Sequence, residues 1–461
     1  MKIQRFICAI LMLGAVFASQ SASAQLKTSY FMEGSYFRTD MNPALAPTRG
    51  YIALPLISGF AAGQYSNYNS YENMYYKVDG SYVGAINESV PANEFLSKLP
   101  NTCVESINAN FNIIRLGFYT LNGTFFNFGA NARMEMNSVM PKEYFKMLKG
   151  AYDNSINIDG MSADINGYLE TYAGTAFRIG ENITIGARLK FLVGLENGRV
   201  DINKMQVEDG KYSVSGNIKL NSIEYNSADY DGETNMDIIW DDSPQAVWSN
   251  LHSFGGAVDL GVEVRLWDNR LKVSGAITDL GFINWSSKSQ MEGELTIKEE
   301  ISDKINVIGL LDRTDFEMPD KLSGYATRLT TNLNLAAEYN FLNNHFAVGA
   351  ISHTRFYRNA IATEFTASFN VRPTNWMTFT TSHTFLNGNT PGIFGAAINI
   401  HPRALNIFIG MDYISSRKNT TDFEPTTMSE IDSMLSPKAT SYNFYIGVGF
   451  NFGRPDFLVE Q

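Results

Sequence analysis

The chain has 461 residues, of which 13 % are aromatic and only 18 % are charged, and it contains 37 glycines. This composition is typical of a β protein rich in glycine and aromatic residues, and the length fits two or three soluble domains or one large barrel. The acidic balance, 47 Asp and Glu against 36 Lys and Arg, argues against a nucleic-acid partner. Five histidines and two cysteines offer little for metal or redox chemistry, so no cofactor is expected.

The first 24 residues have the pattern of a Sec signal peptide. Lys2 and Arg5 precede the apolar run 6–18, and the small residues 22–24 form a cleavage site before Gln25. The run is too short to cross a bilayer, and no later stretch supplies the ~20 apolar residues of a membrane helix. We therefore expect an exported protein that is not held by helices.

Processing changes both the charge and the cysteine count. Loss of Lys2 and Arg5 leaves 34 basic residues against 47 acidic ones, so the formal charge falls from −11 to −13. Cys8 is removed with the signal and lies too far from the cleavage site to be a lipoprotein cysteine. Cys103 then stands alone, which excludes an internal disulfide framework.

Residues 25–50 separate the signal from the first expected strand. Two prolines oppose regular structure there, and Arg38, Asp40 and Asn42 could contact polar groups of a lumen. Two interpretations are open: a plug folded into a barrel, or a disordered periplasmic leader.

Long stretches further along the chain alternate between apolar and polar residues. They include 124–136, 183–193, 254–266, 329–341 and 362–372. These stretches run for roughly 11 to 15 residues where a globular strand averages about 5 to 6, and that length suits tilted membrane-barrel strands. A soluble protein of several β-sandwiches is the alternative. The polar parity carries charges that would line a lumen, either as a substrate path or as ordinary barrel filling: Arg133, Glu135, Arg188, Lys190, Asp259, Glu263, Arg265, Glu338, Glu364 and Arg372.

Tight, asparagine-rich links alternate with longer excursions, as short periplasmic turns alternate with longer outside loops in outer-membrane barrels. We therefore expect an all-β fold, a transmembrane antiparallel barrel of about fourteen strands, since an even number returns both termini to the periplasm. About sixteen is the alternative, because 199–224 could form a further hairpin; we interpret that region as strands extended above the membrane. The expected strands are 51–63, 106–120, 123–137, 167–180, 183–195, 252–266, 270–285, 326–341, 345–357, 360–372, 375–387, 391–401, 404–415 and 441–452.

The last strand ends in a pattern that resembles the barrel-assembly signal. Gly447, Phe450 and Phe452 have the spacing of that signal, while Ile446 stands where a polar residue is usual and nine residues follow Phe452. We expect the barrel-assembly machinery as a partner, and a periplasmic tail at 454–461 after the barrel of residues 51–453.

The triplet Asn42-Pro43-Ala44 resembles the NPA motif of FadL-type outer-membrane transporters for long-chain fatty acids and other hydrophobic compounds. In that family the N-terminal segment folds into the lumen as a hatch. The stretches ITDLGFINW (277–285) and PKEYFKMLKG (141–150) resemble a FadL-like or PorV-like family of Bacteroidetes outer-membrane proteins. The resemblance implies a plug at 25–50, with plug or ligand contacts at Arg38, Asn42, Pro43 and Ala44. A barrel of this size has a lumen that is either open or occupied.

The long connections contain two helix patterns and one acidic segment. Residues 140–152 and 91–99 place apolar residues at helical spacing, so they could hold a ligand at the mouth or pack on each other. The segment 224–242 is acidic without a basic residue; we interpret it as a solvated loop, with a Ca²⁺ site as the alternative.

Catalytic motifs are lacking. The sequence has no G-x-S-x-G, H-E-x-x-H or C-x-x-C, and Ser352-His353 and Ser382-His383 point to opposite faces of a strand. We expect no enzyme, with an outer-membrane lipase as the alternative.

The leading hypothesis is FadL-like transport of a small hydrophobic molecule across the outer membrane of a Gram-negative bacterium. It predicts an apolar pocket under the loops and release when the plug shifts. A PorV-like barrel that binds secretion-system proteins and a general diffusion porin are the alternatives. Outer-membrane lipid is an expected partner in each case.

Overall fold

The computed structural model describes residues 27–55, 58–69, 71–208, 211–230, 236–241, 243–300, 315–317, 323–385, 393–414 and 441–453. The predicted signal peptide and the predicted tail at 454–461 lie outside these residues. Within the described ranges, no helix is long and apolar enough to cross a membrane.

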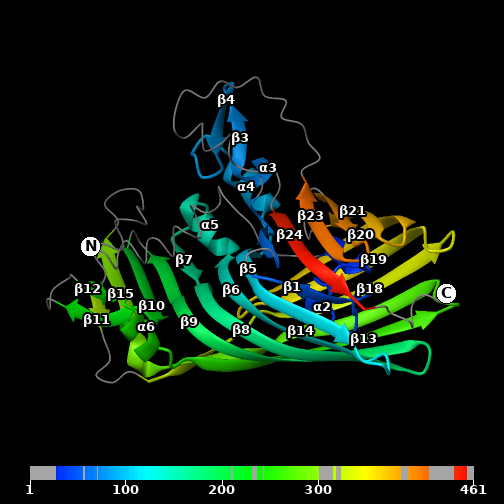
Figure 1. Ribbon diagram of the computed structural model, residues 1–461. Helices are drawn as coiled ribbons and strands as arrows, with labels where there is room; N and C mark the ends of the chain where they lie inside the picture. The colour runs from blue at the N-terminus through cyan, green and yellow to red at the C-terminus, as the bar shows by residue number, and fades with distance from the viewer. Residues whose placement is uncertain are drawn as a thin grey trace.

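Fourteen strands form one closed antiparallel barrel, as the alternating sequence predicts (Figure 1). Two wall strands are interrupted: β1 (Gly50–Ala53) continues as β2 (Phe60–Ser66), and β17 (Tyr325–Arg328) continues as β18 (Thr331–Phe341). The barrel closes because β1 pairs with the last strand, β24, on one side and with β5 on the other. The other wall strands are β5 (Thr102–Tyr119), β6 (Phe125–Pro141), β8 (Met161–Ile179), β9 (Ile183–Glu208), β13 (Phe254–Leu266), β14 (Leu271–Trp285), β19 (Phe346–Phe356), β20 (Ile361–Thr374), β21 (Met377–Phe385), β22 (Ile393–Ile400), β23 (Leu405–Ile414) and β24 (Ser441–Phe452).

Side chains of the wall alternate between the lumen and an outer apolar band. On β9, Leu189 is 70 % exposed and Phe191 53 % exposed, while Arg188 and Lys190 between and beside them are buried. Such a band is the surface that lipid requires. In the predicted assembly signal of β24, Phe450 and Phe452 belong to the band, and Gly447 packs against the ring of Phe408 on β23.

One end of the barrel carries the long connections, and we call it the long-loop end. There β9 runs on past the wall: it pairs with β13 over residues 183–193, and its second half pairs with β10 (Lys211–Ser222). Since β10 pairs next with β15 (Gln290–Glu300), this region extends the sheet beyond the barrel and adds no strand to the wall. The fourteen-strand interpretation of 199–224 is therefore confirmed. Other elements at this end are β7 (Ser155–Ile158), β11 (Tyr225–Tyr230), β12 (Met236–Trp240), α6 (Pro244–Ser249), η3 (Ser287–Ser289) and β16 (Asp315–Glu317).

The long-loop end also bears a cap, which we define as residues 71–99 together with 142–151. It contains α3 (Tyr71–Met74), β3 (Tyr75–Val78), β4 (Ser81–Gly84), α4 (Ala92–Lys98) and α5 (Lys142–Leu148), and Figure 1 shows the β3–β4 hairpin standing above the barrel. The rings of Phe95 and Phe145 lie 5.9 Å apart, centroid to centroid, in the apolar core of the cap. The two predicted helices therefore pack on each other.

The opposite end, the short-turn end, joins neighbouring strands by tight turns. Two of them, at 267–269 and 342–344, pass through three consecutive residues with positive φ. Asn and Asp tolerate this left-handed conformation better than other side chains, which explains the asparagine-rich links in the sequence.

Candidate functional site: a latched plug beside a charged chamber

Residues 27–49 lie inside the barrel, and we call them the plug. They include η2 (Thr28–Phe31) and α2 (Arg38–Met41), whose side chains are buried with few exceptions. Tyr36 stacks on Tyr51 of β1 with ring centroids 4.6 Å apart, and Phe37 lies 4.4 Å from Phe408 of β23. Residues 27–49 therefore pack against the wall.

Asp40 of α2 fastens the plug to two wall arginines. Arg115 on β5 donates to both carboxylate oxygens at 3.2 and 2.7 Å, and Arg188 on β9 donates to Oδ1 at 2.9 Å. Arg188 also donates to the backbone oxygen and the hydroxyl of Thr39, each at 2.9 Å. We call Asp40, Arg115 and Arg188 the latch. Bidentate guanidinium–carboxylate contacts are strong. Loss of the Asp40 carboxylate would leave buried Arg115 without its partner and buried Arg188 with only Asp259, 3.8 Å away.

The predicted triplet 42–44 lies against two wall glycines. A Cβ on Gly261 of β13 would lie 2.0 Å from Asn42 Oδ1, and a Cβ on Gly186 of β9 would lie 2.2 Å from the carbonyl carbon of Pro43. Asn42 Oδ1 accepts a hydrogen bond from the N–H of Ala44 at 2.9 Å, while Asn42 Nδ2 donates to a wall carbonyl oxygen at 3.3 Å. The triplet thus requires wall positions that carry no side chain.

The described chain begins in the lumen toward the long-loop end. Lys27 is fully buried, its Nζ lies 2.9 Å from Glu364 on β20, and its backbone N–H donates to Asp412 on β23 at 2.9 Å. From there the plug runs to Gly50 at the short-turn end. Wall side chains donate to its carbonyl oxygens along the way: Arg372 to Phe31, Asn406 to Gly34 and Asn334 to Met41.

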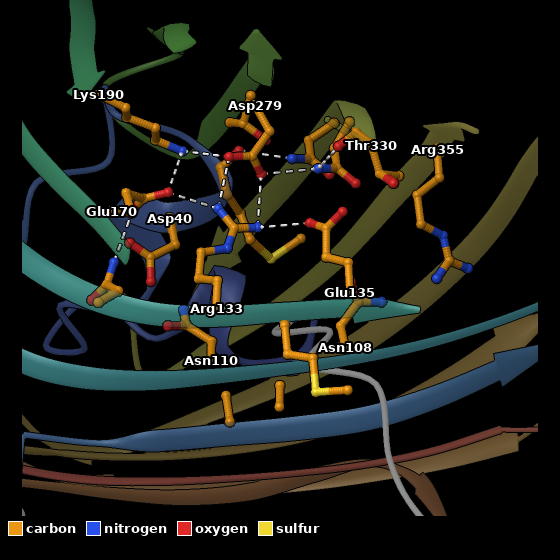
Figure 2. A pocket seen from close by; sticks show the side chains of 18 of the residues that line it. Asp40, Asn108, Asn110, Arg133, Glu135, Glu170, Lys190, Asp279, Thr330 and Arg355 are labelled. Carbon is orange, nitrogen blue, oxygen red and sulfur yellow. Dashed lines mark hydrogen bonds and ion pairs between the residues drawn. The ribbon is translucent and has the colours of Figure 1, made fainter. Parts of the chain in front are cut away.

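A chamber of about 100 Å³ adjoins the latch (Figure 2). Asp40 and Arg188 line it, together with Arg133, Glu135 and Lys190. The lining of this chamber is charged, whereas the predicted apolar pocket belongs under the outside loops and stays a prediction. The reason for the charged lining is the alternation along the strands. Because the apolar residues of each strand face the lipid, the polar residues between them face the lumen.

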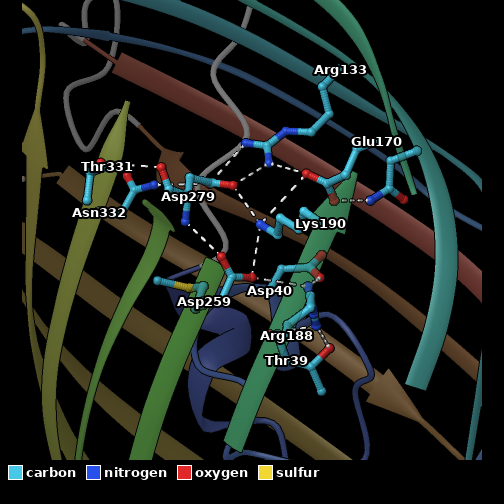
Figure 3. A network of polar contacts seen from close by, with 12 residues as sticks. Thr39, Asp40, Arg133, Glu170, Arg188, Lys190, Asp259, Asp279, Thr331 and Asn332 are labelled. Carbon is cyan, nitrogen blue, oxygen red and sulfur yellow. Dashed lines mark hydrogen bonds and ion pairs between the residues drawn. The ribbon is translucent and has the colours of Figure 1, made fainter. Parts of the chain in front are cut away.

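The wall charges beside the chamber form one connected network (Figure 3). Lys190 Nζ lies 2.9 Å from Asp259 and 2.6 Å from Asp279, and Arg133 lies 2.8 Å from Asp279 and 2.9 Å from Glu170. These residues come from β6, β8, β9, β13 and β14, which are neighbours in the wall. Five predicted lumen charges meet in this network: Arg133, Glu135, Arg188, Lys190 and Asp259.

A bulge in β14 brings Asp279 into the network. Thr278 and Asp279 together stand opposite Asp259 of β13, where the register shifts. Asp279 has a φ of 58°, and its backbone N–H donates to Asp259 Oδ1 at 2.7 Å. The extra residue breaks the alternation, so two consecutive side chains are buried on the lumen side.

The chamber also reaches a seam in the wall between β2 and β5. Ser66 pairs with Glu105, and the N–H of Asn112 donates to the carbonyl oxygen of Gly59 at 2.9 Å, but within the described residues 60–65 no pairing with β5 occurs. Ala61 and residues 108–110, which flank the seam, line the chamber. The wall here is joined at both ends and unpaired between them.

The remaining predicted lumen charges lie outside the chamber lining. Glu263 pairs with Arg265 at 2.7 Å, and Glu338 pairs with Arg372 at 2.6 Å. Arg38 is buried in α2. Among the described residues, no group of His, Cys, Asp and Glu suits a metal ion.

Three residues of the site were missed in the sequence: Arg115, Glu170 and Asp279. Arg115 follows a bulge in β5 at 112–114, and Asp279 lies in the bulge of β14. Glu170 lies within an expected strand, at a position where the alternation predicts a side chain that faces the lumen, so it could have been identified from the sequence.

Comparison with known proteins identifies a family. The model of a family described as a family of unknown function (DUF5723) matches residues 43–412. No match is found among curated proteins.

Several solved membrane barrels are similar to this chain in general form. The toluene transporter TodX of P. putida shows 9 % identity and a TM-score of 0.39 over 90 % of this chain and 93 % of its own. A Pseudomonas aeruginosa FadL homologue shows 9 % identity and a TM-score of 0.37 over 94 % of this chain and 99 % of its own. A TodX deltaS2 mutant, a monoaromatic hydrocarbon channel, shows 8 % identity and a TM-score of 0.43 over 94 % and 96 %. At these scores the functional argument rests on the residues of this chain.

Proposed function

Because this chain belongs to DUF5723, a family of unknown function, we propose its function from its own geometry. It is a plugged outer-membrane transport barrel in which a small molecule occupies the lumen chamber and passes when the plug shifts.

The observation that carries this proposal is the position of the chamber between the latch and the seam. Asp40 and Arg188 line one side, and Ala61 with residues 108–110 lines another. A molecule in the chamber therefore contacts the groups that fasten the plug and also the unpaired part of the wall. Occupancy of the chamber can in this way be coupled to plug release, since a ligand shifts an equilibrium only through contacts that differ between two states.

We propose a small hydrophobic molecule with one polar group as the passenger. The charged lining suits the polar group, and the seam adjoins the apolar outer band, where Phe60 and Phe111 are exposed. An entirely apolar molecule would desolvate the chamber charges without compensating them.

We also propose that the protein reaches the outer membrane by Sec export and signal cleavage, followed by insertion through the barrel-assembly machinery. The closed barrel and its apolar band support a membrane location, and the positions of Gly447, Phe450 and Phe452 in the strand that closes the barrel support their role in assembly.

A second candidate is a PorV-like role in binding secretion-system proteins. The observation that favours it is the cap, which raises the β3–β4 hairpin above the barrel on its own apolar core. A general diffusion porin is disfavoured, because the plug occupies the lumen that such a porin keeps open.

Native mass spectrometry of the protein, extracted gently from its own outer membrane, separates the candidates. A stoichiometric small molecule recovered by organic extraction supports the transporter. A specific protein partner with an empty barrel supports the PorV-like role and contradicts the transporter.

A cross-link across the seam tests directly whether the molecule passes through the wall between β2 and β5. The contacts Ser66–Glu105 and Gly59–Asn112 share one register, which places Ala62 opposite Ala109 across the seam. A disulfide formed in an Ala62→Cys/Ala109→Cys variant should stop uptake of the co-purified molecule, and reduction should restore it. The single Ala109→Cys variant is the control. If uptake is the same with and without the disulfide, passage through the seam is ruled out.

A further inference from the structure

We infer that the chamber binds the ammonium group of a small amine, held by Glu135, Asn131 and Asn110. The inference names the polar group of the passenger and so rests on the proposed function, but binding can be tested without any measurement of passage.

The first argument is charge. The network beside the chamber joins five carboxylates and four cations through ion pairs of 2.6 to 3.8 Å. The carboxylates belong to Asp40, Glu135, Glu170, Asp259 and Asp279, and the cations to Arg115, Arg133, Arg188 and Lys190. With every group ionised, the network has one formal negative charge in excess. A buried charge without compensation is costly, so a bound cation would stabilise it.

A second group of charges does not supply the missing cation. Arg355, which also lines the chamber, lies 3.0 Å from Glu364, and Glu364 also binds Lys27. Asp412 accepts the backbone N–H groups of Lys27 and Thr28. Two cations and two carboxylates balance within this group.

The second argument is the arrangement of acceptors. Glu135 Oε2, Asn131 Oδ1 and Asn110 Oδ1 line the chamber as buried oxygens without a hydrogen-bond partner. Glu135 is 3 % exposed and Asn131 2 % exposed. Thr330 also lies beside the Glu135 carboxylate and lines the chamber. Figure 2 shows the Glu135 side chain directed into the chamber beside Arg133.

The orientation of Asn131 is set by its other neighbour. Asn131 Nδ2 donates to Glu170 Oε1 at 2.9 Å, so its amide oxygen is turned away from that carboxylate. Glu135 Oε1 is 3.3 Å from Arg133 Nη2, which leaves Oε2 as the oxygen able to accept. A primary ammonium group has three donors and no acceptor, and therefore matches three oxygens that need donors. An anion would meet these oxygens with repulsion.

Equilibrium dialysis of the purified mature protein in detergent, with radiolabelled methylammonium in sodium-containing buffer, tests the inference. We expect one methylammonium bound per barrel and no binding of radiolabelled acetate. Glu135→Gln removes the charge and keeps the shape, and it should weaken binding by about tenfold or more. Glu263→Gln is the matched control, because it changes the net charge equally at a buried lumen carboxylate outside the chamber.

A second variant guards against a merely structural effect of Glu135. Asn110→Lys provides an ammonium group tethered to the chamber wall and leaves Glu135 in place, so it should also abolish methylammonium binding. Absence of binding in the wild type, equal loss in Glu263→Gln, or binding of acetate in place of methylammonium would each overturn the inference. None of these results bears on whether the barrel transports, which native mass spectrometry and uptake of the co-purified molecule test separately.

Discussion

Two wall glycines determine whether the plug can lie where it does. Gly186 and Gly261 face the triplet 42–44 so closely that any side chain would enter the space of the plug. The two glycines were visible in the sequence as members of alternating stretches, and their partner triplet was visible as a motif. Their contact was not, because it joins segments more than 140 residues apart.

Gly261→Ala should loosen the plug. The added methyl group meets the Asn42 side chain at 2.0 Å, and overpacking of this kind typically costs about 1–3 kcal/mol. Limited proteolysis of the protein in detergent should cut the plug faster in the variant. Gly256→Ala in the same strand is the control, because its Cβ would find only an ordinary contact at 3.5 Å. Equal cleavage of the two variants contradicts the close fit.

The alternation of side chains along the strands predicted which side of the wall most charged residues face. The prediction failed at β-bulges, where the alternation is interrupted. Arg133, Glu135, Arg188, Lys190 and Asp259 are inward as predicted. Arg115 and Asp279 follow or occupy bulges, and a bulge adds one residue without a sequence signal strong enough to locate it.

A single substitution in the latch should be enough to release the plug from the wall. Asp40→Asn leaves Arg115 buried without its carboxylate and Arg188 with only the longer contact to Asp259 at 3.8 Å, and breaking a buried pair in this way costs about 3–5 kcal/mol. We expect ion conductance in planar bilayers to appear in this variant and to be absent in the wild type. Glu143→Gln, at a half-exposed ion pair on α5, should behave as the wild type because surface pairs contribute little. If the Asp40→Asn variant shows no ion conductance, the role of the latch in closing the lumen is contradicted.

The cap is a separate packed element, and Cys103 reports on it. The thiol is buried in the cap core, and this burial raises its pKa to about 12. Because the thiolate is the reactive form, maleimide should label the native protein very slowly at pH 8. Phe95→Ala removes the largest side chain of α4 from the same core, so labelling should accelerate by about tenfold or more if opening becomes easier by about 1.4 kcal/mol.

Ser97→Ala on the exposed side of α4 is the matched control for the cap and should leave the labelling rate unchanged. Rapid labelling of the wild type would mean that the cap is open in solution.

At the scale of the whole barrel, the apolar band should set how well the protein inserts. Leu189 lies six residues from the start of β9 and is 70 % exposed. For a strand with the tilt usual in membrane barrels, this position is close to mid-membrane. Leu189→Arg should destabilise the barrel by about 2–4 kcal/mol, whereas Ile183→Arg at the short-turn end should cost about 0–1 kcal/mol. Urea titration of the protein folded into lipid vesicles measures both values. Similar costs at the two positions contradict the assigned depth.

The fold could be predicted from the sequence to a large extent, and the site only in part. Wall strands follow from local alternation and turn chemistry, which is why fourteen strands and the course of 199–224 were predicted correctly. The chamber, in contrast, is formed by side chains from different wall strands and the plug, which come together only in the folded barrel. Pairings such as Arg133 with Asp279 and Arg115 with Asp40 are set by register, bulges and closure of the barrel, and a local pattern does not contain them.

The path of the plug has a consequence for the order of events in folding. Lys27 is enclosed toward the long-loop end, the plug leads straight into β1, and β1 makes the last pairing that closes the wall with β24. The plug is held at once by β5, β20 and β23. We therefore expect the wall to close around its own N-terminal segment, which would make the plug a template for barrel assembly as well as the segment that closes the lumen.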